Sequence, residues 1–398
     1  MRWLFVICLI IAIIGIWGYI DFHLGKYVHA KNWKKREYPK RKSHIQLITN
    51  GGELYKSYFQ DLQEAKHSIH ILFYIVKNDR FSKLFFEALI EQAQRGIKIQ
   101  LLLDWLGSRK VPKEWIMEAR KYGIEIEFCH RPSFPFLFFT LQQRNHRKIT
   151  IIDSHIGYLG GYNIGKEYID MEPELSPWRD YHIRIVGEGA LDLEQEFLVD
   201  WYRATNKKVN ITHKPEKVVG ESLHYFYPSE GIGVVEHIEN LIHSAEESII
   251  IGTPYFVPPK KVFLALLDAL NRGVYVSVLV PDKADHPFVK EGSFPFLRKL
   301  LGAGGKVHQY EKGFFHAKVI VLDNMICDIG TANFDNRSFL LNHEINCFIY
   351  DQDFIKEVKE ALQEDMNRST FLTLENLKKV PFSVTIREWI AGLVRGLL

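Results

Sequence analysis

The hydrophobic and polar positions separate an apolar N-terminal run from a longer part in which short apolar runs alternate with amphipathic ones. Residues 3–20 form an uncharged apolar run. As a helix rising about 1.5 Å per residue, it would extend roughly 27 Å, close to the thickness of a bilayer's hydrocarbon core. A buried core helix would show a polar stripe, and this run has none. The pattern therefore predicts one membrane-spanning helix within residues 1–22.

Two other interpretations of this run fit less well. Residues 28–30 loosely resemble a signal-peptide cleavage site, but charged and polar residues separate them from the apolar run. A lipoprotein signal needs a small residue before its cysteine, and Cys8 is preceded by Ile7. We therefore expect a retained anchor.

The rest of the chain contains a repeat. Each copy shows an apolar strand pattern, an amphipathic helix pattern, an Arg-Gly pair and a second apolar strand. Continuous β-branched runs favour strands that are covered on both faces, so the repeat predicts an α/β architecture. The predicted domains are residues 46–210 and 211–370, with a connection near residues 204–221 and a C-terminal helical segment over 371–398.

The charge of the chain is unevenly distributed. The formal net charge is +3, but residues 1–50 hold nine Lys and Arg against two acidic residues. Seven of the nine lie between Lys31 and Lys42, inside a basic linker predicted over residues 23–45. The positive-inside rule then places the following chain in the cytoplasm. The remaining 42 basic and 46 acidic residues give the body a slight negative charge, which disfavours a nucleic-acid-binding protein.

Both halves carry the same polar motif. In the first half His146 and Lys148 are followed by Asp153, and in the second half His316 and Lys318 are followed by Asp323. In each half an Asn comes ten residues after the Asp, behind a glycine-containing segment, and these are Asn163 and Asn333. One match could arise by chance; two, each at the end of a repeat, could not.

The spacing of the motif suits phosphate chemistry. If the residues after each histidine form a strand, the His and Lys side chains lie on one face, about 7 Å apart at their Cα atoms. A lysine and an amide beside an imidazole would stabilise charge on non-bridging phosphate oxygens. Two histidines supply a nucleophile and an acid–base group. Lysines provide the positive charge and no carboxylates cluster with them, so no metal or other cofactor is expected.

These residues resemble the phospholipase D superfamily, whose two HKD motifs are matched by the two His-x-Lys-x4-Asp segments. Flanking segments at residues 160–168, 178–182 and 330–338 are similar to those of bacterial cardiolipin synthases. The resemblance covers roughly residues 46–398. It implies two phospholipase D-like α/β/α sandwich domains that form a pseudo-dimer with one active site between them.

The resemblance also implies roles for individual residues. His146 would form a phosphohistidine intermediate and His316 would act as acid and base, while Lys148, Lys318, Asn163 and Asn333 would bind phosphoryl oxygens. Asp180 and Glu344 would orient the two imidazoles. Asp153 and Asp323 would either take part in catalysis or brace the turn that follows each strand.

The predicted function is cardiolipin synthesis from two phosphatidylglycerol molecules in the cell membrane. The expected partners are phosphatidylglycerol, other anionic phospholipids and the bilayer, and no nucleic acid. Phospholipid hydrolysis is the first alternative and a nuclease the second, and the oligomeric state stays open.

The predicted function does not explain two further features of the sequence. The Ser-Phe-Pro-Phe segments at residues 133–136 and 293–296 form either an apolar rim for acyl chains or ordinary core, and residues 382–398 form either an interfacial helix or one docked on the body.

Overall fold

The computed structural model describes residues 2–209, 211, 218–286, 288–393 and 395–397. The predicted connection between the halves therefore lies partly outside the described residues.

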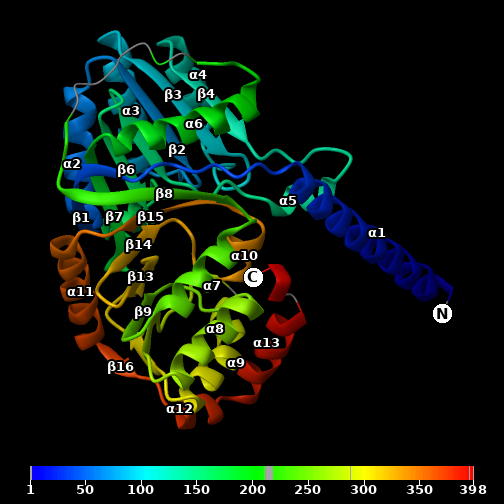
Figure 1. The fold of residues 1–398 in the computed structure, drawn as a ribbon. Helices are drawn as coiled ribbons and strands as arrows, with labels where there is room; N and C mark the ends of the chain where they lie inside the picture. The colour runs from blue at the N-terminus through cyan, green and yellow to red at the C-terminus, as the bar shows by residue number, and fades with distance from the viewer. Residues whose placement is uncertain (1, 210, 212–217, 287, 394, 398) are drawn as a thin grey trace.

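The N-terminal helix α1 (Arg2–Asn32) projects away from the body (Figure 1). From Trp3 onward it is long and apolar enough to cross a membrane, with a mean hydropathy of 2.6 in its most apolar window and 6% of that window buried. The single predicted apolar helix is confirmed. It continues past residue 22 to Asn32, because helix-compatible residues follow the apolar run and Pro39 comes only later.

The first half of the body (Figure 1) contains a mixed set of helices and strands. In chain order they are β1 (Arg41–Asn50), α2 (Gly51–Glu64), β2 (Ser68–Phe73), α3 (Arg80–Gln94), β3 (Lys98–Asp104), α4 (Lys113–Lys121), β4 (Glu125–Cys129), α5 (Leu137–Gln142), β5 (Ile149–Ile152), β6 (Ile156–Gly160), a 3-10 turn (Lys166–Ile169), β7 (Trp178–Gly187) and α6 (Gly189–Thr205).

The second half follows a similar order, with a short strand where the first half has α5, a helix where it has the 3-10 turn, and added elements at the C-terminal end. Its elements are β8 (Ser222–Glu230), α7 (Val234–Ser244), β9 (Ser248–Gly252), α8 (Lys260–Asn271), β10 (Tyr275–Pro281), α9 (Val289–Gly302), β11 (Lys306–Tyr310), β12 (Phe314–Phe315), β13 (Val319–Leu322), β14 (Ile326–Gly330), α10 (Asn336–Leu340), β15 (His343–Ile349), α11 (Gln352–Asn367), β16 (Ser369–Phe371), α12 (Leu374–Lys378), α13 (Phe382–Leu393) and a 3-10 turn (Arg395–Leu397).

Within the described residues, one sheet runs through both halves in the order β16-β11-β10-β9-β13-β14-β15-β8-β1-β7-β6-β5-β2-β3-β4. In each half three strands are parallel, β2-β3-β4 and β9-β10-β11, and the strands toward the centre are antiparallel. The halves join at the centre, where residues 41–43 of β1 pair with residues 222–224 of β8.

The central strands are continuous apolar runs in the sequence because both of their faces are buried in the core. The residues of β5 and β13 are all buried, and so are nearly all of those of β2 and β10. One cluster of buried side chains lies in each half, and a third passes from Ile183 and Phe197 of the first half to Val321 and Val358 of the second. Each buried side chain of this size contributes about 1.5–3 kcal/mol. The halves are therefore packed into one body.

The two Ser-Phe-Pro-Phe segments differ in environment. In the first, Phe134 is 83% exposed, and the chain continues into α5, which packs on the base of α1. A Cβ on Gly25 of α1 would lie 2.6 Å from the Phe139 side chain, so the glycine permits this close approach. In the second, Phe294 is buried within α9. The second segment is therefore core, and the first lies beside the anchor.

The C-terminal helix α13 docks on α9 and also exposes an apolar side. Arg298 of α9 binds Glu388 through two hydrogen bonds of 2.6 and 2.7 Å. Phe382, Ile386, Trp389 and Leu393 stay exposed along the helix. The contacts therefore support the docked interpretation. Residues 394 and 398 of the predicted segment lie outside the described residues.

Candidate active site

Reciprocal strand pairing between the halves places the two histidines. Asn145, just before His146, bridges to His343 of the second half, and the amide of His146 donates to the His343 carbonyl at 2.9 Å. Likewise, β12 pairs with the start of β7, and the amide of His316 donates to the Arg179 carbonyl at 2.7 Å. Each histidine is therefore held by the backbone of the opposite half.

The same pairing brings each imidazole to a carboxylate of the opposite half. His146 Nδ1 lies 3.0 Å from Glu344 Oε2, and His316 Nδ1 lies 2.6 Å from Asp180 Oδ2. Both carboxylates are fully buried. Because Nδ1 of each ring faces a carboxylate, Nε2 is the ring nitrogen left for chemistry. The prediction that Asp180 and Glu344 orient the imidazoles stays a prediction about function, but the geometry it requires is present.

Burial controls the protonation of the two histidines. It lowers the pKa of His146 to about 4, although Glu344 acts in the opposite direction. It likewise lowers the pKa of His316 to about 4, assisted by the nearby Lys318 and opposed by Asp180. At neutral pH both rings are thus largely neutral before substrate binds. A neutral imidazole retains the lone pair that a nucleophile or a base needs.

The two motif lysines lie beside their own histidines. Lys148 Nζ donates to the His146 carbonyl at 2.6 Å, and Lys318 Nζ lies 2.6 Å from His316 Nδ1 and 3.5 Å from Asp180. Both side chains are buried, and burial lowers both lysine pKa values. They concentrate donor groups at the histidines, which suits an anionic phosphoryl group.

The two motif asparagines are also buried, but their amide groups differ in how they are used. Asn163 Oδ1 accepts from the Ile75 amide at 3.1 Å, and its Nδ2 lies 3.3 Å from the Tyr168 hydroxyl. Asn333 Oδ1 has no hydrogen-bond partner within the described residues. Contact of either residue with a phosphate stays a prediction.

The structure does not bring Asp153 and Asp323 to the histidines. Each lies past the far end of its strand, β5 or β13, and accepts hydrogen bonds from three consecutive backbone amides. For Asp153 these amides belong to residues 66–68, at 2.7–2.9 Å, and for Asp323 to residues 246–248, at 2.7–2.8 Å. Both residues have a positive φ, near +50°. Of the two roles considered, bracing the turn is the one these contacts support.

Several residues near the histidines were not predicted. The Thr331 hydroxyl donates to Glu344 at 2.6 Å, and the rings of Tyr74 and Trp178 lie 4.8 and 4.9 Å from those of His146 and His316. Thr331 and Trp178 lie inside the segments that resemble cardiolipin synthases, so the sequence did indicate that these two residues lie near the site. Tyr74 ends an apolar strand pattern, and nothing in that pattern marks it.

Two groups of metal-ligating residue types occur within the described residues, His29 with Glu230 and His343, and Asp104 with Cys129 and His130. Neither contains His146 or His316. The absence of a metal cofactor from the reaction stays a prediction.

Comparison with known proteins agrees with this geometry. The family model described as "Cardiolipin synthase, PLD-like domain" matches residues 58–201 and 238–366, one match in each half. The chain belongs to this family. The resemblance to the phospholipase D superfamily and to cardiolipin synthases, the enzyme class and the α/β fold class predicted from the sequence are thereby confirmed.

Relatives within the cardiolipin synthase family cover nearly the whole chain. The minor cardiolipin synthase ClsB of Bacillus subtilis is 37% identical over 98% of both chains. The major cardiolipin synthase ClsA of the same organism is 35% identical over 89% of this chain and 75% of its own. A solved structure, phosphatidylserine synthase of Haemophilus influenzae, covers 94% of this chain with a TM-score of 0.72 at 16% identity, which shows the shared fold.

Replacing Asp153 or Asp323 with alanine should lower stability and leave the chemistry intact. Each variant loses the acceptor for three backbone amides, at about 2 kcal/mol for a partly solvated charged group. We expect a lower thermal midpoint and turnover per folded molecule within about twofold of the wild type. Asp268→Ala, which removes an exposed ion pair with Arg272, is the control and should change stability little. Unchanged stability together with lost turnover would show instead that Asp153 and Asp323 take part in catalysis.

Proposed function

We propose that this chain is a membrane-anchored cardiolipin synthase that transfers a phosphatidyl group from one phosphatidylglycerol to the hydroxyl of a second. The single observation that carries the proposal is the pair of buried imidazoles, each oriented by a carboxylate of the opposite half. The family to which the chain belongs, and its relatives named as cardiolipin synthases, support phospholipids as its substrates.

In the first step, Nε2 of His146 attacks phosphorus and the bond between phosphorus and the glycerol oxygen breaks. The leaving glycerol takes a proton from His316, and a phosphohistidine remains on His146. The anionic phosphodiester favours the protonated form of His316, which burial disfavours. Lys148 and Lys318 supply positive charge, and Asn163 and Asn333 supply amide groups, for the non-bridging oxygens.

In the second step, the hydroxyl of another phosphatidylglycerol attacks phosphorus. Its proton passes to His316, the phosphorus–nitrogen bond breaks, and cardiolipin is released. Throughout, the Nδ1 proton of His146 stays on the ring, directed at Glu344, which stabilises the charge that the imidazole acquires. Atoms and charges balance without a metal or redox partner.

We also propose that the body lies on the cytoplasmic side of the membrane. The basic residues between Lys31 and Lys42 follow the apolar part of α1 directly, and such clusters are retained on that side. A protease added outside sealed right-side-out vesicles should leave the body intact, whereas the same protease should digest it in inverted vesicles. Digestion from the outside alone would reverse the proposed orientation.

The products formed from pure phosphatidylglycerol test the proposed reaction. Full-length protein in phosphatidylglycerol vesicles should release glycerol and form cardiolipin in equal amounts, and His146→Ala should reduce both at least 1000-fold. Phosphatidic acid in place of cardiolipin would assign the chain to hydrolysis. Full turnover by the His146→Ala protein would contradict the covalent step.

Isosteric changes of the two orienting carboxylates should separate the roles of the histidines. Asp180→Asn removes a charge that raises the pKa of His316, so the protonated form is lost at lower pH and the alkaline limb of the pH–rate profile moves toward lower pH. We expect a 10- to 100-fold loss with phosphatidylglycerol. A p-nitrophenyl phosphatidyl ester, whose leaving group needs no proton, should rescue release of the leaving group.

Glu344→Gln is the matched comparison, because it acts on the proposed nucleophile. It should impair the reaction with both substrates, since the attacking imidazole is required whatever group leaves. Rescue of Glu344→Gln, and not of Asp180→Asn, by the p-nitrophenyl ester would exchange the assignments of His146 and His316.

A further inference from the structure

A cavity of about 370 Å³ lies where the last turns of α1 meet the body. Its walls come from the end of α1, the segment between β4 and β5, α6, and the facing ends of β8 and β15. Neither His146 nor His316 lines it. The volume is far above the 10–15 Å³ that a single water needs, and it falls in the range of small-molecule sites.

Two buried polar atoms on the walls, Nδ1 of His130 and Nε2 of Gln143, have no hydrogen-bond partner in the part of the chain that the structure describes. On the same walls His343 Nδ1 and Asp200 Oδ1 face each other at 3.9 Å, beyond hydrogen-bond distance, and Arg203 lies 3.8 Å from the same Asp200 oxygen. The His343 and Gln143 side chains are 5% and 8% exposed. Burial lowers the pKa of both histidines, so each ring is neutral and offers one acceptor nitrogen. Buried polar groups are seldom left without a partner, so this wall is suited to a polar occupant.

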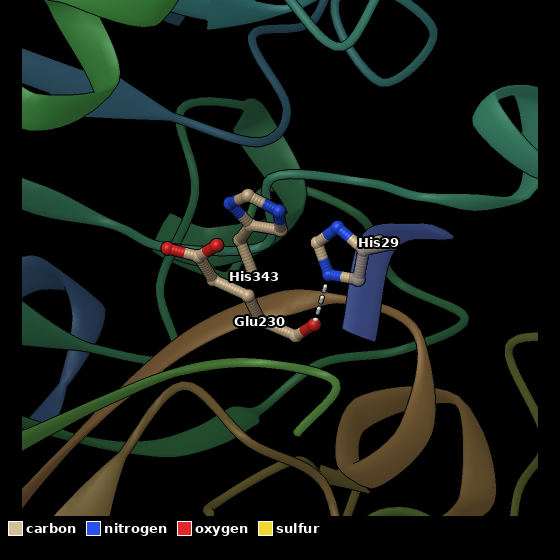
Figure 2. A group of neighbouring side chains, drawn as sticks. All are labelled: His29, Glu230 and His343. Atoms are coloured by element: carbon tan, nitrogen blue, oxygen red, sulfur yellow. Dashed lines mark hydrogen bonds between the residues drawn. The ribbon is translucent and has the colours of Figure 1, made fainter. Parts of the chain in front are cut away.

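His29, His343 and Glu230 all line this cavity, and Figure 2 shows the rings of His29 and His343 side by side next to Glu230. The His29 ring Nε2 lies 2.8 Å from the Glu230 carbonyl. The Glu230 carboxylate is already bound by Arg36 and, at 2.6 Å, by Arg203. Two guanidinium groups at this carboxylate repel a divalent cation, which argues against a metal ion as the occupant.

Arg131 at the mouth of the cavity favours an anion, because it lines the cavity and is exposed. Arg203 also lines the cavity but already binds Glu230 at 2.6 Å. Guanidinium groups bind phosphate oxygens in a planar, two-bond geometry. The cavity also adjoins α5, whose phenylalanines pack on α1, so a ligand that enters from the bilayer passes along an apolar surface.

We propose that this cavity is a second binding site, separate from the catalytic histidines, for a phosphate ester with free hydroxyl groups: the headgroup of a glycerol-bearing anionic phospholipid. The hydroxyls donate to His130 and to the Asp200 carboxylate, while Gln143 and Arg131 hold the phosphate. This assignment concerns binding alone and does not rest on the transfer reaction.

A ligand in the cavity would lie next to backbone groups that position His146. The His343 amide donates to the Arg144 carbonyl at 2.8 Å, and the His343 carbonyl accepts from the His146 amide. The next residue is Glu344, which faces the His146 ring. A lipid bound at Asp200 therefore lies beside the His343 side chain, and the His343 backbone helps to position both His146 and, through the next residue, Glu344.

Native mass spectrometry of the full-length, detergent-solubilised protein tests the site directly. His146→Ala as the background prevents turnover during titration with phosphatidylglycerol. We expect one bound molecule more per chain in this background than after Ala204→Trp, which fills the cavity. Tyr202→Trp is the matched control, because Tyr202 lies two residues away on α6 and does not line the cavity. Arg131→Gln should raise the dissociation constant of this additional molecule at least threefold.

The other outcomes overturn the proposal in distinguishable ways. Equal stoichiometry in all variants would show that the cavity does not bind the lipid. Equal retention of phosphatidylcholine would remove the role of the hydroxyls. Binding of free glycerol phosphate as tight as that of the lipid would assign the cavity to a soluble ester, and zinc bound one to one and lost in Ala204→Trp would make it a metal site. Failure of the product assay would leave a positive binding result intact.

Discussion

The structure depends on an exchange between its halves: the carboxylate that orients each histidine belongs to the other half. This exchange follows from two short backbone pairings, Asn145 with His343 and β12 with β7, which are equivalent by the internal repeat. Burying a carboxylate and an imidazole is unfavourable unless they are paired and hydrogen-bonded. Packing of the halves and completion of the site are therefore the same event, and the core cluster shared by both halves stabilises it.

Much of this could be predicted because the signal was repeated. The anchor, the α/β halves and the residues His146, Lys148, His316 and Lys318 were found from spacing and hydrophobic pattern. The exchange of carboxylates between the halves could not be predicted, because spacing along the chain contains no information about which half faces which. Asp180 and Glu344 were proposed through resemblance, and their partners emerged only from the fold.

The aspartates show a second limit of sequence patterns. Asp153 and Asp323 recur at a fixed distance from the histidines as strictly as the lysines do, yet they lie at the opposite ends of β5 and β13. A recurring polar residue signals a shared constraint, and here that constraint is a turn with a positive φ whose amides need an acceptor. The cavity under α1 could not be predicted for a different reason: the polar residues that line it come from separate segments and share no repeated motif.

The continuity of α1 has a consequence for how substrate reaches the enzyme. The helix passes without a break from its apolar part to Asn32, and Asp21, His29 and then Arg36 tie it and the following segment to the body. From Ile20 to Asn32 it rises about 18 Å. It thus acts as a rigid spacer rather than a tether. Because α1 is fixed to the body at its base, the body and the apolar part of the helix move as one unit, and any tilt of the helix in the bilayer tilts the active site with it.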